Sequence, residues 1–453
     1  MDNRDYLDCK PMTLMDILNL RDSRVEKQKE MLQSLKQEGS LVCFTMNISG
    51  PYKTFSLVQE GFLEGVNKIR ILVGSQHILE DHMNIQDAGF EYYCLTDQNA
   101  ENLKRELAAF EDMHPIGRLF DIDVLDAEGY KVSRSVLGLP DRKCLICNEN
   151  GHACTRGRKH PVSELQAKTI KLLRQFVGES FSDSIAEKII YAMLTEVSVT
   201  PKPGLVDRAD NGAHQDMNFM TFIKSSSVLY KYFRKITLHA YQNCEKDMSS
   251  LFKDIRLFGR LAEHEMFMAT AGINTHKGAI FSFALLAASA GILKGRGEKI
   301  TSCAVADESG KLAVYALDDF ENKLTDITAG IKIYREHQWK GIRGEAIQGF
   351  PSVMNIALPV MRKGMQMRED MNETSLKALL QLMLHVEDTN MFKRGGEEGV
   401  AYVRQQIESW DESKESVENF AGRLNVEMIK RNISPGGCAD LLAVTFFMKM
   451  LDT

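Results

Sequence analysis

The chain has 453 residues, of which 44% are apolar and 26% charged, which is the balance of a water-soluble globular protein of two or three domains. Its formal net charge of −6 provides no general attraction to nucleic acid or to an anionic membrane, so we expect neither as a partner. The polar start of the chain lacks the apolar core of a signal peptide, no apolar stretch reaches about 18 residues, and the nine cysteines are an odd number. These features predict a cytoplasmic protein with reduced thiols.

The first part of the chain predicts a mixture of helices and strands. Thr13 is a suitable N-cap for a helix that ends near residue 35, and residues 101–113 have the apolar spacing of an amphipathic helix. Segments rich in β-branched and aromatic residues predict strands at 41–48, 69–74 and 91–96. We therefore expect an α+β domain over residues 1–177.

A pair of carboxylates follows in the segment HPIGRLFDIDVLD (114–126). Strand alternation places Asp121 and Asp123 on one face, where they are suited to hold Mg²⁺ against substrate phosphates. A DxD pattern alone is common. Its interpretation is strengthened by Gly117, which permits close approach of a ligand, and by Arg118, which pairs with phosphate.

Three cysteines and a histidine come next, with the spacing C-x2-C-x6-C-x5-H. They are Cys144, Cys147, Cys154 and His160. Such a set provides the four ligands of a closed structural zinc site, and the alternative is a group of free thiols in a reducing compartment. The flanking basic residues are Arg142, Lys143, Arg156, Arg158 and Lys159. Because no aromatic residue lies between Cys144 and His160 and no repeated unit follows, this charge favours a phosphate-rich small substrate or an acidic protein partner over nucleic acid.

These motifs, GRLFDIDVLDAEG and RKCLICNENGHACTRGRKH with the opening TLMDILNLRDSRVEKQ, resemble the apo-citrate lyase phosphoribosyl-dephospho-CoA transferase family over roughly residues 12–172. The resemblance implies a nucleotidyltransferase-type domain that attaches a prosthetic group to a serine of the citrate lyase acyl carrier protein and releases diphosphate. It implies that Asp121 and Asp123 are magnesium ligands and that Arg118 contacts phosphate. It also makes Arg21 and Arg24 candidate phosphate contacts.

Beyond residue 178 the strand-like alternation almost disappears, so we expect an all-α helical bundle over 178–453, with the boundary at 178–183. The segment 279–293 is apolar on every side and is expected at the centre of the bundle. Helices are predicted at 184–196, 218–242, 250–270, 279–294, 317–334, 350–362, 373–386, 396–409, 414–432 and 438–451.

Five polar segments interrupt these helices. The first, EVSVTPKPGLVDRADNGAHQDM (196–217), is stiffened by two prolines and carries lysine, aspartate and histidine side chains. The others are GINTHKG (272–278), GIRGEA (341–346), EDTNMFKRGG (387–396) and ISPGGCADLLA (433–443). Each segment alone reads as a loop or a helix cap, but five of them in one helical domain indicate a functional site.

Together the five segments closely resemble the triphosphoribosyl-dephospho-CoA synthase family over roughly residues 184–453. The resemblance implies that ATP and 3′-dephospho-CoA give 2′-(5″-triphosphoribosyl)-3′-dephospho-CoA and adenine, so the chain is similar to a fusion of two consecutive enzymes. Magnesium is then expected at Asp388 and Asp440. The acid–base candidates are Asp207, His214 and Glu345. Contacts to the triphosphate are expected from Lys202, Asn274, His276, Lys277, Arg343 and Arg394.

Three other interpretations remain open at this point. A magnesium-dependent hydrolase of N-glycosidic bonds in ADP-ribose-like substrates would use a similar set of carboxylates, but it would not explain the first domain. A zinc-bearing adaptor for an acyl carrier protein would bind no nucleotide. The parallel malonate decarboxylase cofactor pathway has a synthase similar to the second half, whereas the cysteine-rich first half favours citrate lyase.

Overall fold

The computed structural model describes residues 9–35, 38–316, 339 and 341–452, and the chain divides into two compact units, Met1–Glu179 and Ser180–Thr453. The division falls inside helix α5 (Val162–Ser198). We expected two helices separated by a break at 178–183, but the helix is continuous. The segment contains no proline, and its one glycine costs a helix only about 1 kcal/mol, so nothing in it ends the helix.

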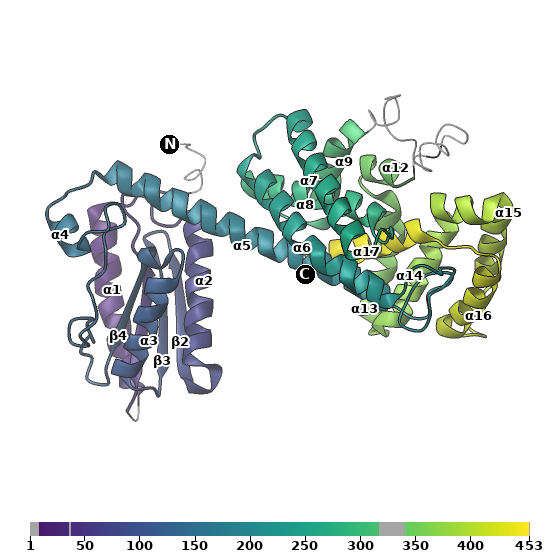
Figure 1. The fold of residues 1–453 in the computed structure, drawn as a ribbon. Coiled ribbons are helices and arrows are strands. Elements are labelled where there is room, and N and C mark those ends of the chain that lie inside the picture. Colours follow the sequence, from purple (N-terminus) through teal and green to yellow (C-terminus); the bar gives the residue numbers. More distant parts are fainter. Residues whose placement is uncertain (1–8, 36–37, 317–338, 340, 453) are drawn as a thin grey trace. The chain divides into compact units, whose positions relative to one another are not determined.

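The first unit is an antiparallel sheet of four strands in the order β2-β3-β1-β4, with helices on both faces (Figure 1). Its elements are α1 (Leu14–Gln33), β1 (Ser40–Met46), α2 (Ser56–Val73), η2 (Ser75–His77), β2 (Ile78–Gln86), β3 (Gly89–Thr96), α3 (Ala100–Met113), η3 (Gly117–Leu119), β4 (Phe120–Leu125) and α4 (Gly151–Arg156). The expected α+β character of this region is confirmed.

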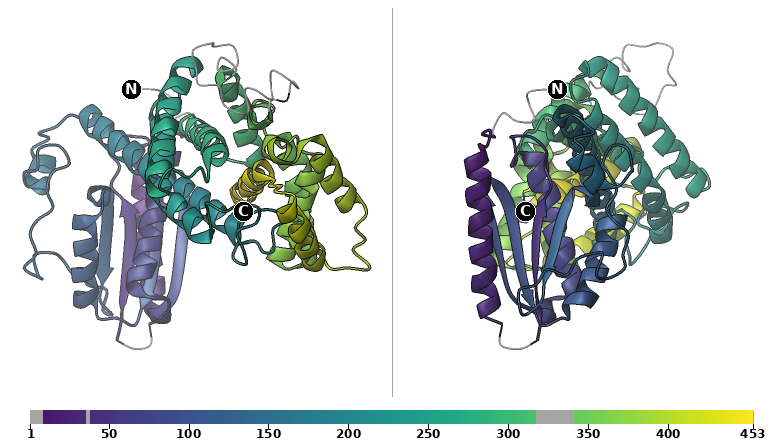
Figure 2. Two further views of the ribbon diagram at one scale, coloured as in Figure 1. Left: turned by 45° about the vertical axis from the view of Figure 1, so that its right-hand side comes forward. Right: turned by 90° about the vertical axis from the view of Figure 1, so that its left-hand side faces the viewer.

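The two faces of the sheet bury different side chains. Phe44, Tyr92 and Ile122 pack with apolar residues of α2 and α3 in the larger core. Cys43 and Tyr93 face the other way and pack near Met31 of α1. The right-hand view of Figure 2 shows α1 alone on its side of the sheet. One face of β4 is therefore part of the larger core, and the other lies on the side of the single helix α1.

Two features of this unit differ from the sequence prediction. Residues 69–74 were expected to form a strand, but they end helix α2. Their β-branched composition was misleading, because the buried residues Val66, Ile69 and Val73 recur at helical spacing. Strand β2 was not predicted at all. It is a largely exposed edge strand, so its sequence lacks the alternation that burial of one face would produce.

The second unit is helical in its described part, as expected. After the end of α5 come α6 (Phe219–Gln242), α7 (Met248–Ala269), α8 (Lys277–Gly295), α9 (Ser302–Ala313), η4 (Val314–Ala316), α12 (Gly341–Ile347), the π-helical turn η5 (Val353–Ala357), α13 (Leu358–Met367), α14 (Met371–His385), α15 (Thr389–Glu408), α16 (Val417–Lys430) and α17 (Gly436–Leu451). Helices α9 and α12 were not predicted, and the helix expected at 317–334 lies outside the described residues.

Helix α8 forms the centre of this unit. Every residue from Ala279 to Leu293 except Phe281 is buried, and α8 packs against α6, α9 and α17. By length and composition α8 is apolar enough to cross a membrane, but here it is enclosed by other helices. Helix α8 packs against α17, which is yellow in the left-hand view of Figure 2, and this contact brings residues distant in sequence together.

Candidate functional sites

The acidic pair of the first unit lies on the α1 side of the sheet. Asp121 and Asp123 pair in register with Thr45 and Cys43 of β1, and both carboxylates border a small depression that Arg24 also lines. Each acid has a cationic neighbour. Asp121 lies 3.4 Å from Arg142, and Asp123 lies 2.5 Å from Lys131. These cations offset the repulsion between two carboxylates on one strand.

The arginines expected near this pair occupy different environments. Arg24 reaches the depression from α1, but its Nε donates to the buried carboxylate of Glu91 at 2.7 Å. Arg118 precedes β4, and its Nε is buried without a hydrogen-bond partner among the described residues. Burial and the nearby Arg142 lower the pKa of Arg118. Arg142 was predicted only as a flanking charge, yet it contacts both Asp121 and the carbonyl oxygen of Phe120.

The three cysteines and the histidine come together in one cluster. The ligand atoms of Cys144, Cys147, Cys154 and His160 all lie within 4.8 Å of one another. The Nε2 atom of His160 is 3.3 Å from the Cys147 sulfur, while its Nδ1 lies 3.4 Å from a carboxylate oxygen of Glu164. A carboxylate behind a histidine is the arrangement that orients zinc ligands in proteins. The donor set therefore fits a tetrahedral zinc ion.

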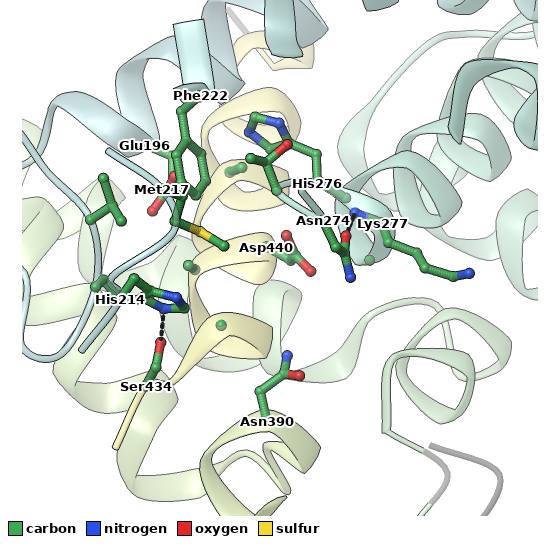
Figure 3. A pocket seen from close by; sticks show the side chains of 18 of the residues that line it. Glu196, His214, Met217, Phe222, Asn274, His276, Lys277, Asn390, Ser434 and Asp440 are labelled. Carbon is green, nitrogen blue, oxygen red and sulfur yellow. Dashed lines mark hydrogen bonds between the residues drawn. The ribbon is translucent and has the colours of Figure 1, made fainter. Parts of the chain in front are cut away.

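The second unit contains a cavity of about 340 Å³ lined by four of the five polar segments. The first turns of three helices contribute to its wall: α8 through Lys277 and Gly278, α15 through Asn390, and α17 through Gly436. Asp440 follows in the second turn of α17. Figure 3 shows Asp440 near the centre of this wall, between the side chains of the other segments. The positive ends of three helix dipoles favour an anionic ligand here.

A buried ion pair lies in this wall. The Nζ atom of Lys202 donates to the carboxylate of Glu196, and both side chains are almost fully buried. The backbone N–H of Lys202 is held by Asp207 at 2.7 Å. Burial raises the pKa of Glu196, and the neighbouring lysine opposes this shift. Lys202 therefore reaches the cavity already paired with a carboxylate that the sequence analysis did not assign.

Asp440 lies close to the start of α8. A hydrogen bond from the backbone of Ala279 holds its carboxylate there. An added Cβ atom at Gly278 would lie only 2.0 Å from the Oδ2 atom of Asp440, so only glycine permits this approach. Burial, followed by the charges of Glu196 and Asp388, raises the pKa of Asp440 well above its ordinary value. The result is a carboxyl group that binds protons more readily than an exposed aspartate does.

Two histidines border the cavity and both are held in place. The Nε2 atom of His214 is hydrogen-bonded to the hydroxyl of Ser434 at 2.9 Å, and its Nδ1 atom lies 3.3 Å from the guanidinium of Arg394. Burial, with a smaller contribution from Arg394, lowers the pKa of His214. His276 is buried, and its Nδ1 lies 2.7 Å from the hydroxyl of Ser225. Burial lowers the pKa of His276 to about 3, so its ring is neutral at physiological pH.

Other predicted residues also line the cavity. Asn274 accepts a hydrogen bond from the backbone N–H of Lys277 at the start of α8. The ammonium group of Lys277 lies 3.1 Å from Glu263 and remains half exposed. Arg394 hydrogen-bonds the carbonyl oxygen of Ala213, which ties the proline-rich segment to α15. The expected polar residues of four segments are thus brought to one place.

Asp207 and Asp388 do not line the cavity. Asp207 accepts hydrogen bonds from the backbone N–H groups of Lys202, Ala209 and Asp210 within its own loop. Asp388 caps α15, and its second oxygen accepts from the N–H of Cys438 in α17 at 2.8 Å. Since backbone donors already occupy these oxygens, the positions favour structural roles over the predicted acid–base and magnesium roles.

Glu345 and Arg343 also lie away from the cavity lining. Glu345 accepts hydrogen bonds from both the hydroxyl and the backbone N–H of Ser352, at 2.6 and 3.2 Å. Burial raises the pKa of Glu345. The guanidinium of Arg343 lies over the ring of Phe281 at 5.7 Å. These contacts link α12 to Ser352 and to Phe281 of α8, whereas the predicted catalytic role of Glu345 and phosphate-binding role of Arg343 stay predictions.

Several lining residues had no assigned role in the sequence analysis. They are chiefly Glu196, Asn390, Lys393 and Ser434. All four stand inside polar segments that the sequence marked as unusual, so the segments were informative although the choice of residue within them was not.

Each of the two units matches a family of known proteins. Residues 182–453 match the family model for ATP:dephospho-CoA triphosphoribosyl transferase, and residues 12–176 match that for apo-citrate lyase phosphoribosyl-dephospho-CoA transferase. The chain is 32% identical to the protein CitXG of Haemophilus influenzae, with 96% of both chains covered. It is 30% identical to the protein CitXG of Leuconostoc mesenteroides subsp. cremoris over 97% of each.

The second half alone has further relatives. It is 38% identical to a probable 2-(5″-triphosphoribosyl)-3′-dephosphocoenzyme-A synthase of Pectobacterium carotovorum, over 58% of this chain and 88% of the relative. The two halves thus match two separate families, and the two CitXG proteins match this chain over nearly its whole length. The chain belongs to the family of bifunctional CitXG enzymes, which make the citrate lyase prosthetic group and attach it to the lyase.

Proposed function

We propose that the cavity of the second unit is where ATP and 3′-dephospho-CoA react, and that the face of β4 carrying Asp121 and Asp123 is where the product is transferred to the carrier protein. The observation that carries the first assignment is the meeting of three helix N-termini, several cations and two buried carboxylates around one cavity. Helix N-termini and cations suit the phosphates of a nucleoside triphosphate. Buried carboxylates suit cleavage of the bond at its ribose.

The triphosphate is bound at the helix starts. Lys277, Lys393 and Arg394 supply side-chain cations beside the positive ends of α8, α15 and α17. Asp440 and the amide of Asn390 offer the hard oxygen donors that Mg²⁺ prefers, so they would hold the ion against the phosphates. Bound there, Mg²⁺ neutralises phosphate charge. Asp388 is not among the proposed ligands, because its oxygens accept three backbone hydrogen bonds.

The bond that breaks in this step joins C1′ of the ATP ribose to N9 of adenine. Its electron pair leaves with adenine, and the oxygen of the dephospho-CoA 2′-hydroxyl forms the new bond to C1′. The hydroxyl loses one proton and adenine gains one, so the step balances. We assign the proton acceptor to Glu196, whose carboxylate faces the cavity and whose pKa is raised by burial. Lys202 keeps this carboxylate in position.

In the first unit, a serine hydroxyl of the carrier protein attacks the α-phosphorus of the triphosphoribosyl group and diphosphate leaves. Asp121 and Asp123 present oxygen donors on one strand face and would hold Mg²⁺, which neutralises charge on the transferred phosphoryl group. Arg118 is the proposed phosphate contact, because its Nε is buried and has no hydrogen-bond partner among the described residues. On this basis we infer a nucleotidyltransferase-type mechanism.

The cysteine–histidine cluster is proposed as a structural zinc site that supports the carrier-binding surface. Lys143, Arg156, Arg158 and Lys159 are exposed and form no ion pair with a described residue. Arg142, next in sequence, contacts Asp121 directly. A partner that presents carboxylates to these cations would bind next to the acidic pair, where its serine must react. These reactions and the free thiols are consistent with a cytoplasmic location, which we include in the proposal.

The first test is chromatography of adenine after the full-length protein is mixed with ATP, Mg²⁺ and dephospho-CoA. Adenine should appear only when dephospho-CoA is present, and Glu196→Gln should abolish it. Adenine released without dephospho-CoA would support a glycoside hydrolase instead. No adenine in either mixture would refute the proposal and favour a zinc-bearing adaptor.

The second test adds apo carrier protein to the same mixture. Mass spectrometry should show the prosthetic group on citrate lyase carrier, and Asp121→Asn should block this transfer without affecting adenine release. Modification of malonate decarboxylase carrier in preference to citrate lyase carrier would support the parallel pathway. Charge reversal by Arg156→Glu with Lys159→Glu should raise KM for the carrier about tenfold. The matched reversal Lys253→Glu in α7 should leave that KM unchanged.

A further inference from the structure

His276 has one ring nitrogen that no residue in the described part of the chain satisfies. Its side chain is only 4% exposed, and Nε2 is buried without a hydrogen-bond partner, although the residue lines the cavity. The opposite nitrogen, Nδ1, lies 2.7 Å from the hydroxyl of Ser225. Buried polar atoms are rarely left unpaired, so Nε2 is expected to meet a group of the ligand.

A chain of hydroxyl groups indicates which ring nitrogen of His276 carries the hydrogen. Thr275 donates its hydroxyl hydrogen to the oxygen of Ser225 at 2.8 Å. Ser225 then has its own hydrogen available for Nδ1 of His276. A neutral imidazole has one N–H group, so when Nδ1 accepts this bond the hydrogen must be on Nε2. The cavity therefore receives a neutral N–H donor.

The surroundings of His276 indicate which part of the substrate this donor meets. The edge of the ring packs against Phe222, with centroids 4.9 Å apart. Figure 3 shows Phe222 and Met217 on the same side of Asp440, with the ammonium group of Lys277 on the other side. Apolar and aromatic walls suit a purine base, and the cationic helix starts suit its phosphates.

We propose that Nε2–H of His276 donates a hydrogen bond to N3 or N7 of the departing adenine. The inference rests on the proposed synthase reaction and assigns the leaving-group contact within it. As the C1′–N9 bond breaks, its electron pair increases the negative charge on the purine, and an N–H donor stabilises that charge. His276 itself neither gains nor loses a proton. This role differs from the cationic triphosphate contact that the sequence predicted.

The test compares ATP with 3-deaza-ATP and 7-deaza-ATP, which each lack one ring-nitrogen acceptor. For each nucleotide, kcat of adenine or deaza-adenine release is measured with the wild type and with His276→Asn. The ratio of wild-type to variant kcat should be roughly 10–100 with ATP, as expected for loss of a hydrogen bond to a charged group. It should fall to near 1 with the analogue that lacks the accepting nitrogen. Intrinsic differences between leaving groups cancel in this ratio.

Equal ratios for all three nucleotides would overturn the inference. His276→Gln, which places an amide N–H near the position of Nε2–H, should recover part of the rate with ATP. Ser225→Ala should lower kcat about threefold to tenfold and show the same dependence on the analogue, because His276 can then adopt the other tautomer. Lys277→Ala is the matched comparison, and it should raise KM for all three nucleotides alike.

Two outcomes distinguish failure of the role proposed for His276 from failure of the proposed synthase reaction. Failure of the wild type to release adenine would refute the synthase assignment itself. Release by the wild type with uniform ratios would refute only the role of His276. Thermal unfolding of each variant identifies any loss of rate that comes from misfolding, and the ratio for ATP should stay constant between pH 6 and pH 9 because His276 does not titrate there.

Discussion

Asp388 offers the sharpest test of how the second unit is built, because its sequence suggested a magnesium ligand and its contacts indicate a structural role. One carboxylate oxygen accepts the N–H groups of Asn390 and Met391, at 2.8 and 3.0 Å, and the other accepts the N–H of Cys438 at 2.8 Å. The side chain is 2% exposed. Asp388 therefore joins the starts of α15 and α17.

The informative substitution is Asp388→Asn. Asparagine still caps a helix, so its oxygen retains the two bonds to α15, but its amide nitrogen then faces the N–H of Cys438. A buried donor without an acceptor costs about 2 kcal/mol. For a urea dependence of about 2 kcal/mol per molar, the midpoint of unfolding should fall by about 1 M.

The assay pairs urea unfolding, followed by circular dichroism, with the Mg²⁺ dependence of adenine release below the unfolding transition. Asp388→Asn should be less stable and keep the wild-type Mg²⁺ requirement. Asp440→Asn should show the reverse, a loss of activity of at least 100-fold with little change in stability. The assignment is refuted if Asp388→Asn keeps its midpoint but requires much more Mg²⁺.

The remaining predictions concern packing, metal and pH. Gly278→Ala should abolish adenine release by displacing Asp440, whereas Gly259→Ala in α7, where an added Cβ meets nothing within 4 Å, should leave it unchanged. Purified protein should contain about one zinc per chain. Cys147→Ser should lose the zinc and the carrier modification but retain adenine release. Substitution of the exposed Cys303 by serine should leave zinc content, carrier modification and adenine release unchanged. The pKa of His276 is lowered to about 3, so the unfolded chain binds the extra proton below about pH 6.5. Between pH 6.5 and pH 5.0 the free energy of unfolding of the wild type should thus fall by about 1.6 kcal/mol more than that of His276→Gln, as measured by urea unfolding at the two pH values.

The sequence was most informative where local chemistry sets the structure. Thr13 caps α1 as predicted, because its hydroxyl accepts from Asp16 and the Asp16 carboxylate accepts in return from Thr13. The all-apolar segment became the central helix α8. By contrast, β2 forms a hairpin with β3, but it is the edge strand of the sheet and none of its residues is buried. A strand that buries neither face needs no alternation of apolar and polar residues, so its sequence contains no periodic signal.

For the candidate site, the sequence predicted which kinds of residue take part but not which individual residues line the cavity. Polar segments indicated that a site exists, but an aspartate in such a segment can equally bind a ligand or a helix N-terminus. Asp388 and Asp440 both belong to segments at helix starts, yet only Asp440 lines the cavity. The difference depends on where the facing helix lies, since Gly278 lets Asp440 approach α8. Sequence spacing within one segment contains no information about that distance.

The contrast between the two sites follows from the bond that each must break. In the synthase step the triphosphate is retained, so it needs fixed positive charge. In the proposed site this charge comes from helix N-termini with Lys277, Lys393 and Arg394, which take no part in bond cleavage. In the transferase step a bond to phosphorus itself is broken, and charge moves on the phosphate. Paired carboxylates on a strand, Asp121 and Asp123, suit that step because they can hold a metal ion at the reacting phosphate. In this proposal one triphosphate group is retained during the reaction of the second unit and cleaved in the first, which would account for two phosphate sites of different construction in a single chain.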